Sequence, residues 1–495
     1  MARDGEKKAV AIIGGGITGL AAAFHLHQCA PDGAEYTLIE ASSRLGGKII
    51  SARENGFLIE GGPDSFLSTK TATMELCRAL GLNDQLIGSN HAQRPTYVWS
   101  RRRLHPMPEG MMMMAPTMVL PFLRSRLVSW PGKLRMGMEV FVPRQAQDQD
   151  ESLASFVRRR LGSEALEKIA APLMAGIHAA DPERLSLQST FPAFQEMERK
   201  HGSLIRGMVK NRRKQTSQTP LNARRPMFTS LRDGLQTLVE AILVQLPPGR
   251  IRLNCRVLHV AAHAGRYGIT LDDGSYLLAD DLVLATPAYV TAELVEGFDP
   301  VLASALRAIR YVSTATVSLG FRRSEIPHSL DGFGFVVSRA EKRKITACSW
   351  SSEKFEGRAP GDCALLRVFV GGAGAEEIAE REEAEPVQVA RQELRSTMGI
   401  HAAPLLARVY RWPRANPQYD IGHRTRIAEI ERMAASHSGL HLAGAAYHGA
   451  GIPDCIQSGR EAAARIAVEA APRRAYQEPV CIQYASRART RRGWE

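Results

Sequence analysis

The residues best placed for chemistry are three glycines near the start of the chain. Gly14, Gly16 and Gly19 stand at G-x-G-x-x-G spacing after the apolar run 10–13, and residues 20–26 continue at helical period. Such glycines allow a tight turn, close approach of the backbone to a pyrophosphate and close packing of helix on strand. The N–H groups that open the helix also attract phosphate. The pattern predicts a dinucleotide site formed by Gly14, Gly15, Gly16, Ile17, Thr18 and Gly19.

An acidic residue completes this unit. The predicted second strand, 36–39, is followed by Glu40, about 20 residues beyond the last glycine, where a carboxylate can hydrogen-bond a ribose diol. Glu40 and the adjacent Ala41 are therefore predicted to lie at the ribose. A strand, a glycine turn, a helix, a second strand and an acid in this order are far more specific than the glycine spacing alone.

A second pair of glycines favours FAD. Gly46 and Gly47 follow the acid and permit another close approach, a feature that a plain NAD-binding unit does not need. Arg44 and Lys48 can reach phosphate, and residues 61–65 form a rigid turn able to pass along a flat ring. Each motif alone is typical of an ordinary turn, but together, downstream of the acid, they indicate FAD. The residues predicted to contact it here are Arg44, Gly47, Lys48, Gly62, Pro63, Asp64 and Ser65.

The other end of the chain repeats this geometry. Residues 440–443 form a predicted buried strand that runs into Gly444, and Ile452, Pro453 and Asp454 precede a predicted helix. A helix N-terminus directed at a flavin would stabilise the negative charge of its reduced form. Taken alone, this segment is an ordinary strand-to-helix turn.

Length and composition set the class of protein. The chain has 495 residues, 44% of them hydrophobic and 23% charged, which predicts a globular protein of two or three domains. It lacks a long uninterrupted apolar run, and its N-terminus leads directly into the first strand, so we expect no transmembrane helix and no signal peptide. The seven cysteines are odd in number and form no C-x-x-C motif. They are expected to be reduced thiols of a cytoplasmic protein.

The charge of the chain is strongly basic. Its formal net charge is +13, and Lys and Arg concentrate in 199–225 and in the tail 473–492. Aromatic residues make up 6%, so a stacking surface for nucleic acid is not expected. Solvated loops, or attraction to an anionic substrate or membrane surface, remain open as explanations.

Periodicity predicts the elements between these motifs. A hairpin is expected at 49–60 with Asn55-Gly56 in its turn, and helices at 71–80, 151–161, 163–171 (with Ser163 as N-cap), 234–246 and 385–398. Strands are expected at 250–254, 257–261, 268–272, 282–285, 314–321 and 364–370. Residues 95–145 are proline-rich and contain the run 111–114 of four methionines. For that run, core packing, a membrane interface and the lip of an apolar channel all remain open.

In its motifs the chain resembles the flavin-dependent porphyrinogen oxidases, relatives of the monoamine oxidases and phytoene desaturases. The resemblance extends from residue 10 to about residue 468, and a set of motifs in this order is highly specific. His178, within the second of them, stands where the family pattern is expected to have an aromatic or apolar residue. The motifs are LHPMP (104–108), APLMAGIHAAD (171–181), GSLIRGM (202–208), FTSLRDGLQTL (228–238), LATPA (284–288), RWPRANPQYDIGH (411–423) and GAGIPDCIQSG (449–459).

The resemblance implies an α/β (α+β) fold: a Rossmann-like FAD-binding domain of the glutathione reductase/monoamine oxidase type with an inserted α+β substrate domain and a helical subdomain. The expected divisions are 1–90, 226–295 and 405–471 for FAD; 172–225 and 296–404 for substrate; and 91–171 for a helical subdomain, a candidate for membrane association. The basic tail at 472–495 is expected to be disordered.

The resemblance also assigns further site residues. Val257 would meet the adenine through its backbone, and Trp412 would lie near the isoalloxazine. Arg94 is the candidate partner of substrate propionates, because a guanidinium pairs with a carboxylate in bidentate fashion. No general base and no metal are expected, and His178, His423 and His448 are interpreted as structural.

The implied reaction removes six electrons from a porphyrinogen in three two-electron steps, with hydride leaving a meso carbon for flavin N5 and O2 yielding H2O2. Coproporphyrinogen III is favoured over protoporphyrinogen IX because the RLHPMPEG form of the 103–110 segment resembles the enzymes that act on the former. Two rivals remain: another flavin amine oxidase or desaturase, and a non-enzymatic relative similar to the prenyl-GTPase chaperones. Oligomeric state is not predicted.

Overall fold

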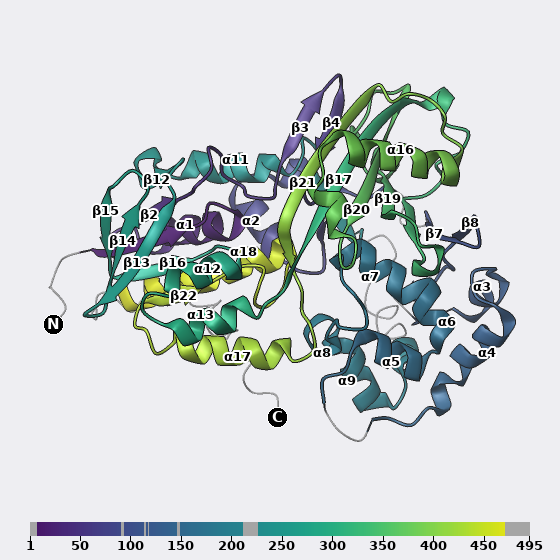
Figure 1. The fold of residues 1–495 in the computed structure, drawn as a ribbon, viewed down its shortest axis with the longest axis horizontal. Coiled ribbons are helices and arrows are strands. Elements are labelled where there is room, and N and C mark those ends of the chain that lie inside the picture. Colours follow the sequence, from purple (N-terminus) through teal and green to yellow (C-terminus); the bar gives the residue numbers. More distant parts are fainter. Residues whose placement is uncertain are drawn as a thin grey trace.

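The computed structural model describes residues 7–90, 94–112, 115–116, 118–145, 149–210 and 226–470. Figure 1 shows a lobe that contains the first strand and the last helix, a lobe built on a large sheet, and a group of helices below that sheet. The basic stretch 211–225, the tail 471–495 and Met113–Met114 lie outside the described residues, so the expectations for them stay predictions.

The first lobe is built on a five-stranded parallel sheet with the order β12-β2-β1-β16-β22. Both faces are buried, as expected for parallel strands with continuous apolar runs. Alternate residues of β1 point to opposite faces: Ile12 packs with helices α1, α11 and α18, whereas Ala11 and Ile13 pack with the elements of the other face. The bounds are β1 Lys8–Ile13, β2 Ala34–Ile39, β12 Ile251–Arg252, β16 Asp281–Leu284, β22 Leu440–Leu442, α1 Ile17–Cys29, α11 Gln236–Gln245 and α18 Ile452–Ala470.

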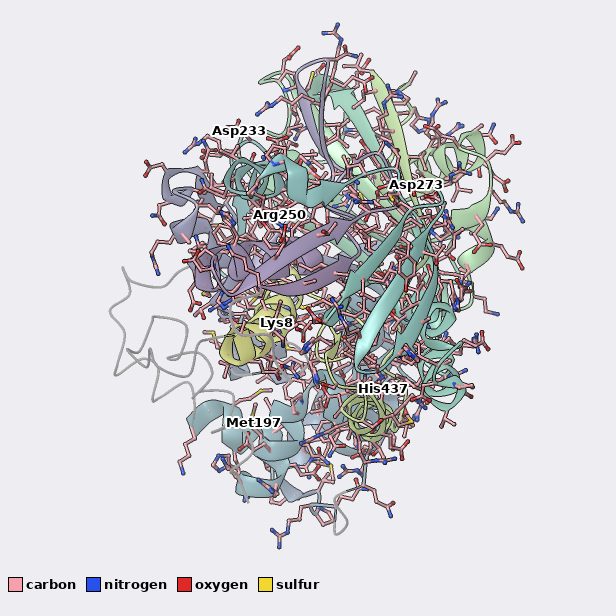
Figure 2. The ribbon with its side chains drawn as sticks, turned by 90° about the vertical axis from the view of Figure 1, so that its left-hand side faces the viewer. Lys8, Met197, Asp233, Arg250, Asp273 and His437 are labelled. Atoms are coloured by element: carbon pink, nitrogen blue, oxygen red, sulfur yellow. The ribbon has the colours of Figure 1, made fainter. Side chains whose placement is uncertain are left out.

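The opposite face of this sheet is covered by a three-stranded antiparallel sheet and three helices. In Figure 2 the antiparallel strands face the viewer, with Asp273 at one of their turns and His437 just after α17. Lys8 lies beside α18 in the same view and pairs with Glu469 of that helix. The bounds are β13 Val257–His263, β14 Arg266–Leu271, β15 Tyr276–Ala279, α12 Ala288–Val295, α13 Pro300–Arg307 and α17 His423–Ala434.

The second lobe is built on a seven-stranded sheet with the order β21-β17-β20-β19-β18-β7-β8, antiparallel except for the pair β18–β7. One face packs on α16 Ala384–Met398 and the other on the helices of residues 119–201. Neighbouring residues divide between the two faces, as Val98 and Trp99 do in β7. The strands are β21 Leu406–Pro417, β17 Tyr311–Arg322, β20 Cys363–Gly371, β19 Ile345–Trp350, β18 Gly334–Val337, β7 Thr96–Ser100 and β8 Arg103–Pro106.

The helical group is held together by a buried ion cluster as well as by apolar packing. Arg160 and Glu139 are fully buried, and Glu139 also accepts from Ser203 Oγ at 2.5 Å and Leu204 N at 2.8 Å. The GSLIRGM motif therefore supplies donors to a buried carboxylate. The elements are α3 Val119–Arg124, α4 Trp130–Gly137, η2 Met138–Phe141, α5 Leu153–Arg160, α6 Ser163–Ala165, a π-helical turn Leu166–Ala170, α7 Ala171–His178, α8 Leu187–Thr190 and α9 Pro192–His201.

Short elements connect these parts. Residues 51–60 form a hairpin, and residues 66–67, 86–88 and 228–231 form a small three-stranded sheet. Both connect the glycine motifs of the first lobe to the second lobe. Among the described residues, no helix combines the length and the apolar character needed to cross a bilayer. The remaining bounds are β3 Ser51–Glu54, β4 Phe57–Glu60, β5 Phe66–Leu67, β6 Leu86–Gly88, β11 Phe228–Leu231, β9 Met111–Met112, β10 Ala115–Pro116, α2 Ala72–Ala79, α14 Ser351–Lys354, α15 Glu376–Glu380, and the 3-10 turns η1 Asn83–Gln85, η5 Pro248–Arg250, η6 Arg323–Glu325 and η7 Arg339–Glu341.

Three expectations are wrong in detail. Strands β7 and β8 lie in the region 91–171 that was expected to be helical, because their residues pair with β18 and extend the large sheet. Ser163 is not an N-cap: Gly162 occupies that position at φ 95°, where a Cβ would meet Arg135. Cys29 is disulfide-bonded, whereas Cys77, Cys255, Cys348, Cys363 and Cys455 are free thiols.

Candidate functional site

The glycine turn after β1 contains glycines of two kinds. Gly14 has φ +106°, and a Cβ there would lie 2.8 Å from Ala285 O at the end of β16. At Gly19 a Cβ would lie 1.9 Å from Gly14 O, so this glycine lets α1 pack on the turn. At Gly16 a Cβ would meet no described atom within 4 Å. Packing therefore requires glycine at positions 14 and 19, whereas Gly16 presents bare backbone to open space.

Gly16 is also the N-cap of α1, and no side chain caps this helix. The N–H groups of the first turn of a helix have no partner inside the helix and carry the positive end of its dipole. Uncapped N–H groups beside bare backbone fit a pyrophosphate. The geometry therefore fits the nucleotide site predicted for residues 14–19.

The second glycine pair packs against the first. Gly46 N donates to Gly15 O at 2.9 Å, and Gly16 and Gly46 form a parallel bridge. A Cβ at Gly47, where φ is +56°, would lie 3.1 Å from Gly16 Cα. The two glycine segments thus form one cradle, which a shorter nucleotide site would not require.

Glu40 is fixed beside this cradle at the end of β2. Its carboxylate accepts from Gly15 N at 2.7 Å, Ser42 N at 2.9 Å and Ser42 Oγ at 2.7 Å. A carboxylate has about four acceptor positions, so one remains for a ribose hydroxyl. The backbone near Val257 is brought to the same place, because Cys255 N donates to Glu40 O and Asn254 N donates to Ser42 O, each at 3.0 Å.

The two basic residues of the second motif bind carbonyl oxygens. Arg44 donates to Gly47 O at 2.7 Å and to Ile49 O, which closes the loop on itself. Lys48 donates to Ala415 O, and its burial lowers the pKa of its ammonium group. Both side chains therefore hold the cradle together, and their contact with phosphate stays a prediction.

The Gly61–Ser65 loop runs from this cradle to the second lobe. A Cβ at Gly62 would lie 1.8 Å from Lys48 O, so the two backbones are in direct contact. Gly61 O accepts from Trp412 Nε1 at 3.0 Å and from Thr316 Oγ1 at 2.9 Å. The structure thus brings the predicted Trp412 to the predicted flavin loop.

Asp64 lies at the centre of a buried charge cluster. Lys354 Nζ lies 3.0 Å from both of its carboxylate oxygens, Ser65 Oγ donates to it at 2.6 Å, and Arg367 lies 3.9 Å away. Burial opposes its ionisation, but the charges of Lys354 and Arg367 outweigh that effect and hold the pKa of Asp64 well below its usual range. The loop therefore carries a fixed carboxylate between two cations.

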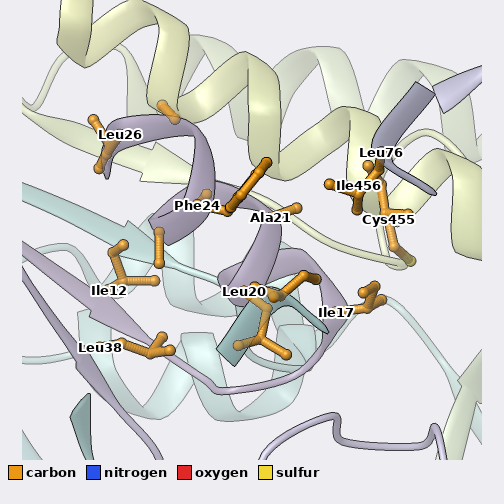
Figure 3. Close-up of a cluster of buried hydrophobic side chains, with 14 of the residues drawn as sticks. Ile12, Ile17, Leu20, Ala21, Phe24, Leu26, Leu38, Leu76, Cys455 and Ile456 are labelled. Atoms are coloured by element: carbon orange, nitrogen blue, oxygen red, sulfur yellow. The ribbon is translucent and has the colours of Figure 1, made fainter. Parts of the chain in front are cut away.

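The C-terminal motif reaches the glycine turn through helix packing. Figure 3 shows α1 side chains such as Phe24 and Ala21 beside Ile456 and Cys455 of α18. A Cβ at Gly459 would lie 2.2 Å from Thr18 O, so the two helices are in backbone contact. Ile452, Pro453 and Asp454 open α18, and Gly444 N donates to Ser458 Oγ of the same helix at 3.0 Å. Asp454 pairs with Lys70 at 2.6 Å.

The substrate side is less complete. Arg94 pairs with Glu353 at 2.7 Å, so its role as a propionate partner stays a prediction. Burial lowers the pKa of His178 and of His423 to about 4, and both rings pack on aromatic residues. His448 pairs with Glu431. These contacts agree with structural roles for the three histidines.

Sequence reasoning missed several residues of the site, notably Ser42, Thr316, Lys354 and Arg367. Only Arg367 carried a usable signal, since it interrupts the apolar run of β20, and a charge in a buried strand must find a partner. Ser42 and Thr316 look like ordinary strand or turn residues, and Lys354 lies about 290 residues from the loop it contacts.

Comparison with known proteins adds to this geometry. Residues 17–467 match the model of the family described as flavin containing amine oxidoreductase. A coproporphyrinogen III oxidase of Bacillus subtilis (strain 168) is 40% identical over 460 residues, covering 92% of this chain and 97% of its own. A protoporphyrinogen oxidase of Bos taurus is 32% identical over 93% of this chain and 98% of its own. A crystal structure from Exiguobacterium sp. 255-15 superposes with a TM-score of 0.83 at 34% identity, covering 94% and 99% of the two chains.

Proposed function

Because the chain belongs to the flavin containing amine oxidoreductase family, we propose that it is an FAD-dependent coproporphyrinogen III oxidase of heme biosynthesis. The observation that carries this function is the 40% identity to a coproporphyrinogen III oxidase over 92% of this chain and 97% of that relative. Identity to the protoporphyrinogen oxidase of Bos taurus is 32% over a similar share of both chains. The favoured substrate is therefore the porphyrinogen with four propionates.

The reaction removes six electrons and six hydrogens from the porphyrinogen, and three molecules of O2 take them up as three H2O2. Bound FAD supplies the two-electron redox chemistry, and the protein supplies binding, orientation and electrostatics. We propose that residues 14–19, Glu40, Gly47 and Val257 hold the nucleotide half. Residues 62–65, Trp412, Gly444 and 452–454 hold the flavin half. The expected domain divisions form part of the same proposal, except that residues 96–106 belong to the large sheet as β7 and β8.

Arg94 is proposed to bind a substrate propionate in competition with Glu353. Both side chains are about one quarter to one third exposed, so a soluble carboxylate can reach the guanidinium. An ion pair of this exposure is worth less than about 1 kcal/mol, so it can be exchanged for a propionate.

We further propose a peripheral contact with an anionic membrane through α3, α4 and η2. These elements expose large apolar side chains, and the side chains of Arg124 on α3 and Arg126 just after it are exposed beside them. Basic residues beside an exposed apolar surface are typical of elements that lie at a membrane interface. The exposed side chains are Leu120, Leu123, Trp130, Leu134, Met138 and Phe141.

The test of the proposed function is anaerobic mixing of the purified flavoprotein with coproporphyrinogen III or protoporphyrinogen IX, followed by admission of air. We expect the flavin absorption to bleach with the former substrate, and porphyrin fluorescence to appear with O2. Faster bleaching by protoporphyrinogen IX would reverse the substrate assignment. A colourless protein that takes up no added FAD would overturn the function as a whole.

A further inference from the structure

Three neighbouring strands of the large sheet direct a side-chain donor at one loop. The strands β21, β17 and β20 are adjacent, and they carry Trp412, Thr316 and Arg367. Gly61 O accepts from the first two at 3.0 and 2.9 Å and from Arg367 Nη2 at 3.4 Å. Arg367 Nη2 also donates to Gly62 O. The loop that the glycine cradle supports from one side is thus held by the sheet from the other.

Arg367 differs from the two other donors because it carries a buried charge. The residue is 3% exposed, and its guanidinium lies over the ring of Phe369, 4.9 Å from the ring centroid. Its Nε is buried and finds no partner among the described residues. Burying a cation is expensive, and apolar residues of similar volume usually stabilise a protein core at least as well. Stability alone therefore does not account for an arginine at this position.

The charge of Arg367 is not cancelled by its surroundings. Asp64, the nearest carboxylate, is 3.9 Å away and is held more closely by Lys354 at 3.0 Å. The second buried carboxylate, Glu60, accepts from Ser51 Oγ and Leu235 N and feels the charge of Arg358. The cluster consists of three cations and two carboxylates and carries a net charge of +1 when all are ionised. Its members are Arg367, Lys354, Arg358, Asp64 and Glu60.

We propose that Arg367 is a positioning residue for the flavin of this enzyme. Its planar fork fixes the carbonyls of the Gly61–Ser65 loop, and its surplus charge makes the flavin easier to reduce. Charge near the flavin ring tunes the electronics of the cofactor, and a cation favours the reduced, anionic form. This inference rests on the proposed binding of FAD but not on the identity of the substrate.

Two variants separate the fork from the charge. Arg367→Lys keeps the cation but loses the planar geometry, whereas Arg367→Met loses both. Arg343→Met is a matched control, because Arg343 is a mostly buried arginine of the same lobe that pairs with Glu393 and lies over Trp99, away from the loop. The readouts are the dissociation constant of FAD from the apoprotein, the flavin reduction potential and the thermal midpoint.

We expect Arg367→Met to weaken FAD binding about tenfold or more, the loss of one charge-assisted hydrogen bond, and to shift the reduction potential to a more negative value. Arg367→Lys should weaken FAD binding but keep the potential near that of the wild type. Arg343→Met should lower the thermal midpoint and change neither flavin property. Should Arg367→Met fail to fold, unchanged FAD binding by Arg367→Lys would still overturn the inference.

The outcomes also distinguish this inference from the proposed function. If the wild type binds FAD and oxidises coproporphyrinogen III while the Arg367 variants match it in FAD affinity and potential, only the inference fails. If the variants change both properties but the wild type does not act on that substrate, the inference stands and the function fails. A wild type that takes up no FAD overturns both.

Discussion

A single methyl group placed at Gly16 tests the nucleotide site most directly. Gly16 has φ −70°, a conformation open to any residue, and a Cβ there would meet no described atom within 4 Å. Gly16→Ala should therefore fold. The added methyl group would project into the open space before the N-terminus of α1, where we expect the pyrophosphate to lie.

The size of the effect follows from what the methyl group displaces. Alanine is a poorer N-cap than glycine, so we expect a loss of less than about 1 kcal/mol in the free energy of unfolding. Moving a phosphate away from one backbone N–H removes a hydrogen bond to a charged group, which is worth about 1.5–3 kcal/mol. At 1.4 kcal/mol for each factor of ten, the dissociation constant of FAD should rise about 10- to 100-fold.

The assay is a titration of apoprotein with FAD, followed by the quenching of flavin fluorescence and combined with urea unfolding of the same samples. Gly19→Ala provides the contrast, because its Cβ would lie 1.9 Å from Gly14 O and would force α1 off the turn. That variant should lose several kcal/mol of stability even without FAD. A Gly16→Ala protein that binds FAD as tightly as the wild type would refute the placement of the pyrophosphate.

Three further predictions concern single side chains of the core and of the candidate site. Glu139→Gln should lower the free energy of unfolding by up to about 3–5 kcal/mol in urea, because it removes the fully buried carboxylate that pairs with Arg160 and leaves only the longer contact with Glu198 at 3.4 Å, whereas Glu196→Gln, at an exposed ion pair of α9, should change it by less than about 1 kcal/mol. His423 has a pKa of about 4 in the folded protein and 6.5 as its ordinary value, so the unfolded chain takes up its proton first. Stability present above pH 6.5 should fall as the pH drops from 6.5 to 4, by up to about 3 kcal/mol; His423→Phe should flatten that part of a pH–stability curve, and an unchanged curve would contradict the assignment. Trp412→Phe removes the donor to Gly61 O at 3.0 Å, so FAD should bind several-fold more weakly while the visible circular dichroism of the flavin changes; an identical spectrum would contradict contact between this loop and the ring.

Local patterns sufficed to predict the nucleotide half of the fold. The strands at 10–13 and 36–39, the hairpin at Asn55-Gly56 and the helix over 234–246 are confirmed as β1, β2, β3–β4 and α11. Each rests on signals within a few residues, namely an apolar run, a turn residue or a 3.6-residue period. Such signals survive because both faces of the parallel sheet are buried, so its central strands contain continuous apolar runs such as residues 10–13 and 282–284.

The second lobe was harder to predict because its strands depend on distant partners. Strand β21, which spans Leu406–Pro417, contains two prolines and three arginines and shows no period of two. It becomes a strand because it pairs along β17, whose alternate residues are buried against the neighbouring layers. Likewise β7 pairs in parallel with β18, more than 230 residues further along the chain. Local propensity is weaker than such tertiary pairing.

The candidate site shows the same division between local and distant information. The glycines and Glu40 can be predicted from their spacing, because their roles depend on backbone geometry. The partners of the flavin loop do not, since Thr316, Lys354 and Arg367 reach it only after the large sheet has formed. The sequence therefore predicts the residues at the nucleotide end of the cofactor more readily than the side chains around its reactive ring.

The short helix α14 links the two sides of the candidate site. Glu353 pairs with Arg94, the predicted propionate partner, and the next residue, Lys354, pairs with Asp64 of the flavin loop. Asn90 strengthens this junction, because its N–H donates to Lys354 O and its Nδ2 to Glu353 O. Adjacent residues on one helical turn cannot shift independently. We therefore predict that a carboxylate which takes Arg94 from Glu353 would change the restraint on Lys354, so that binding at the proposed substrate side would be felt at the proposed flavin loop.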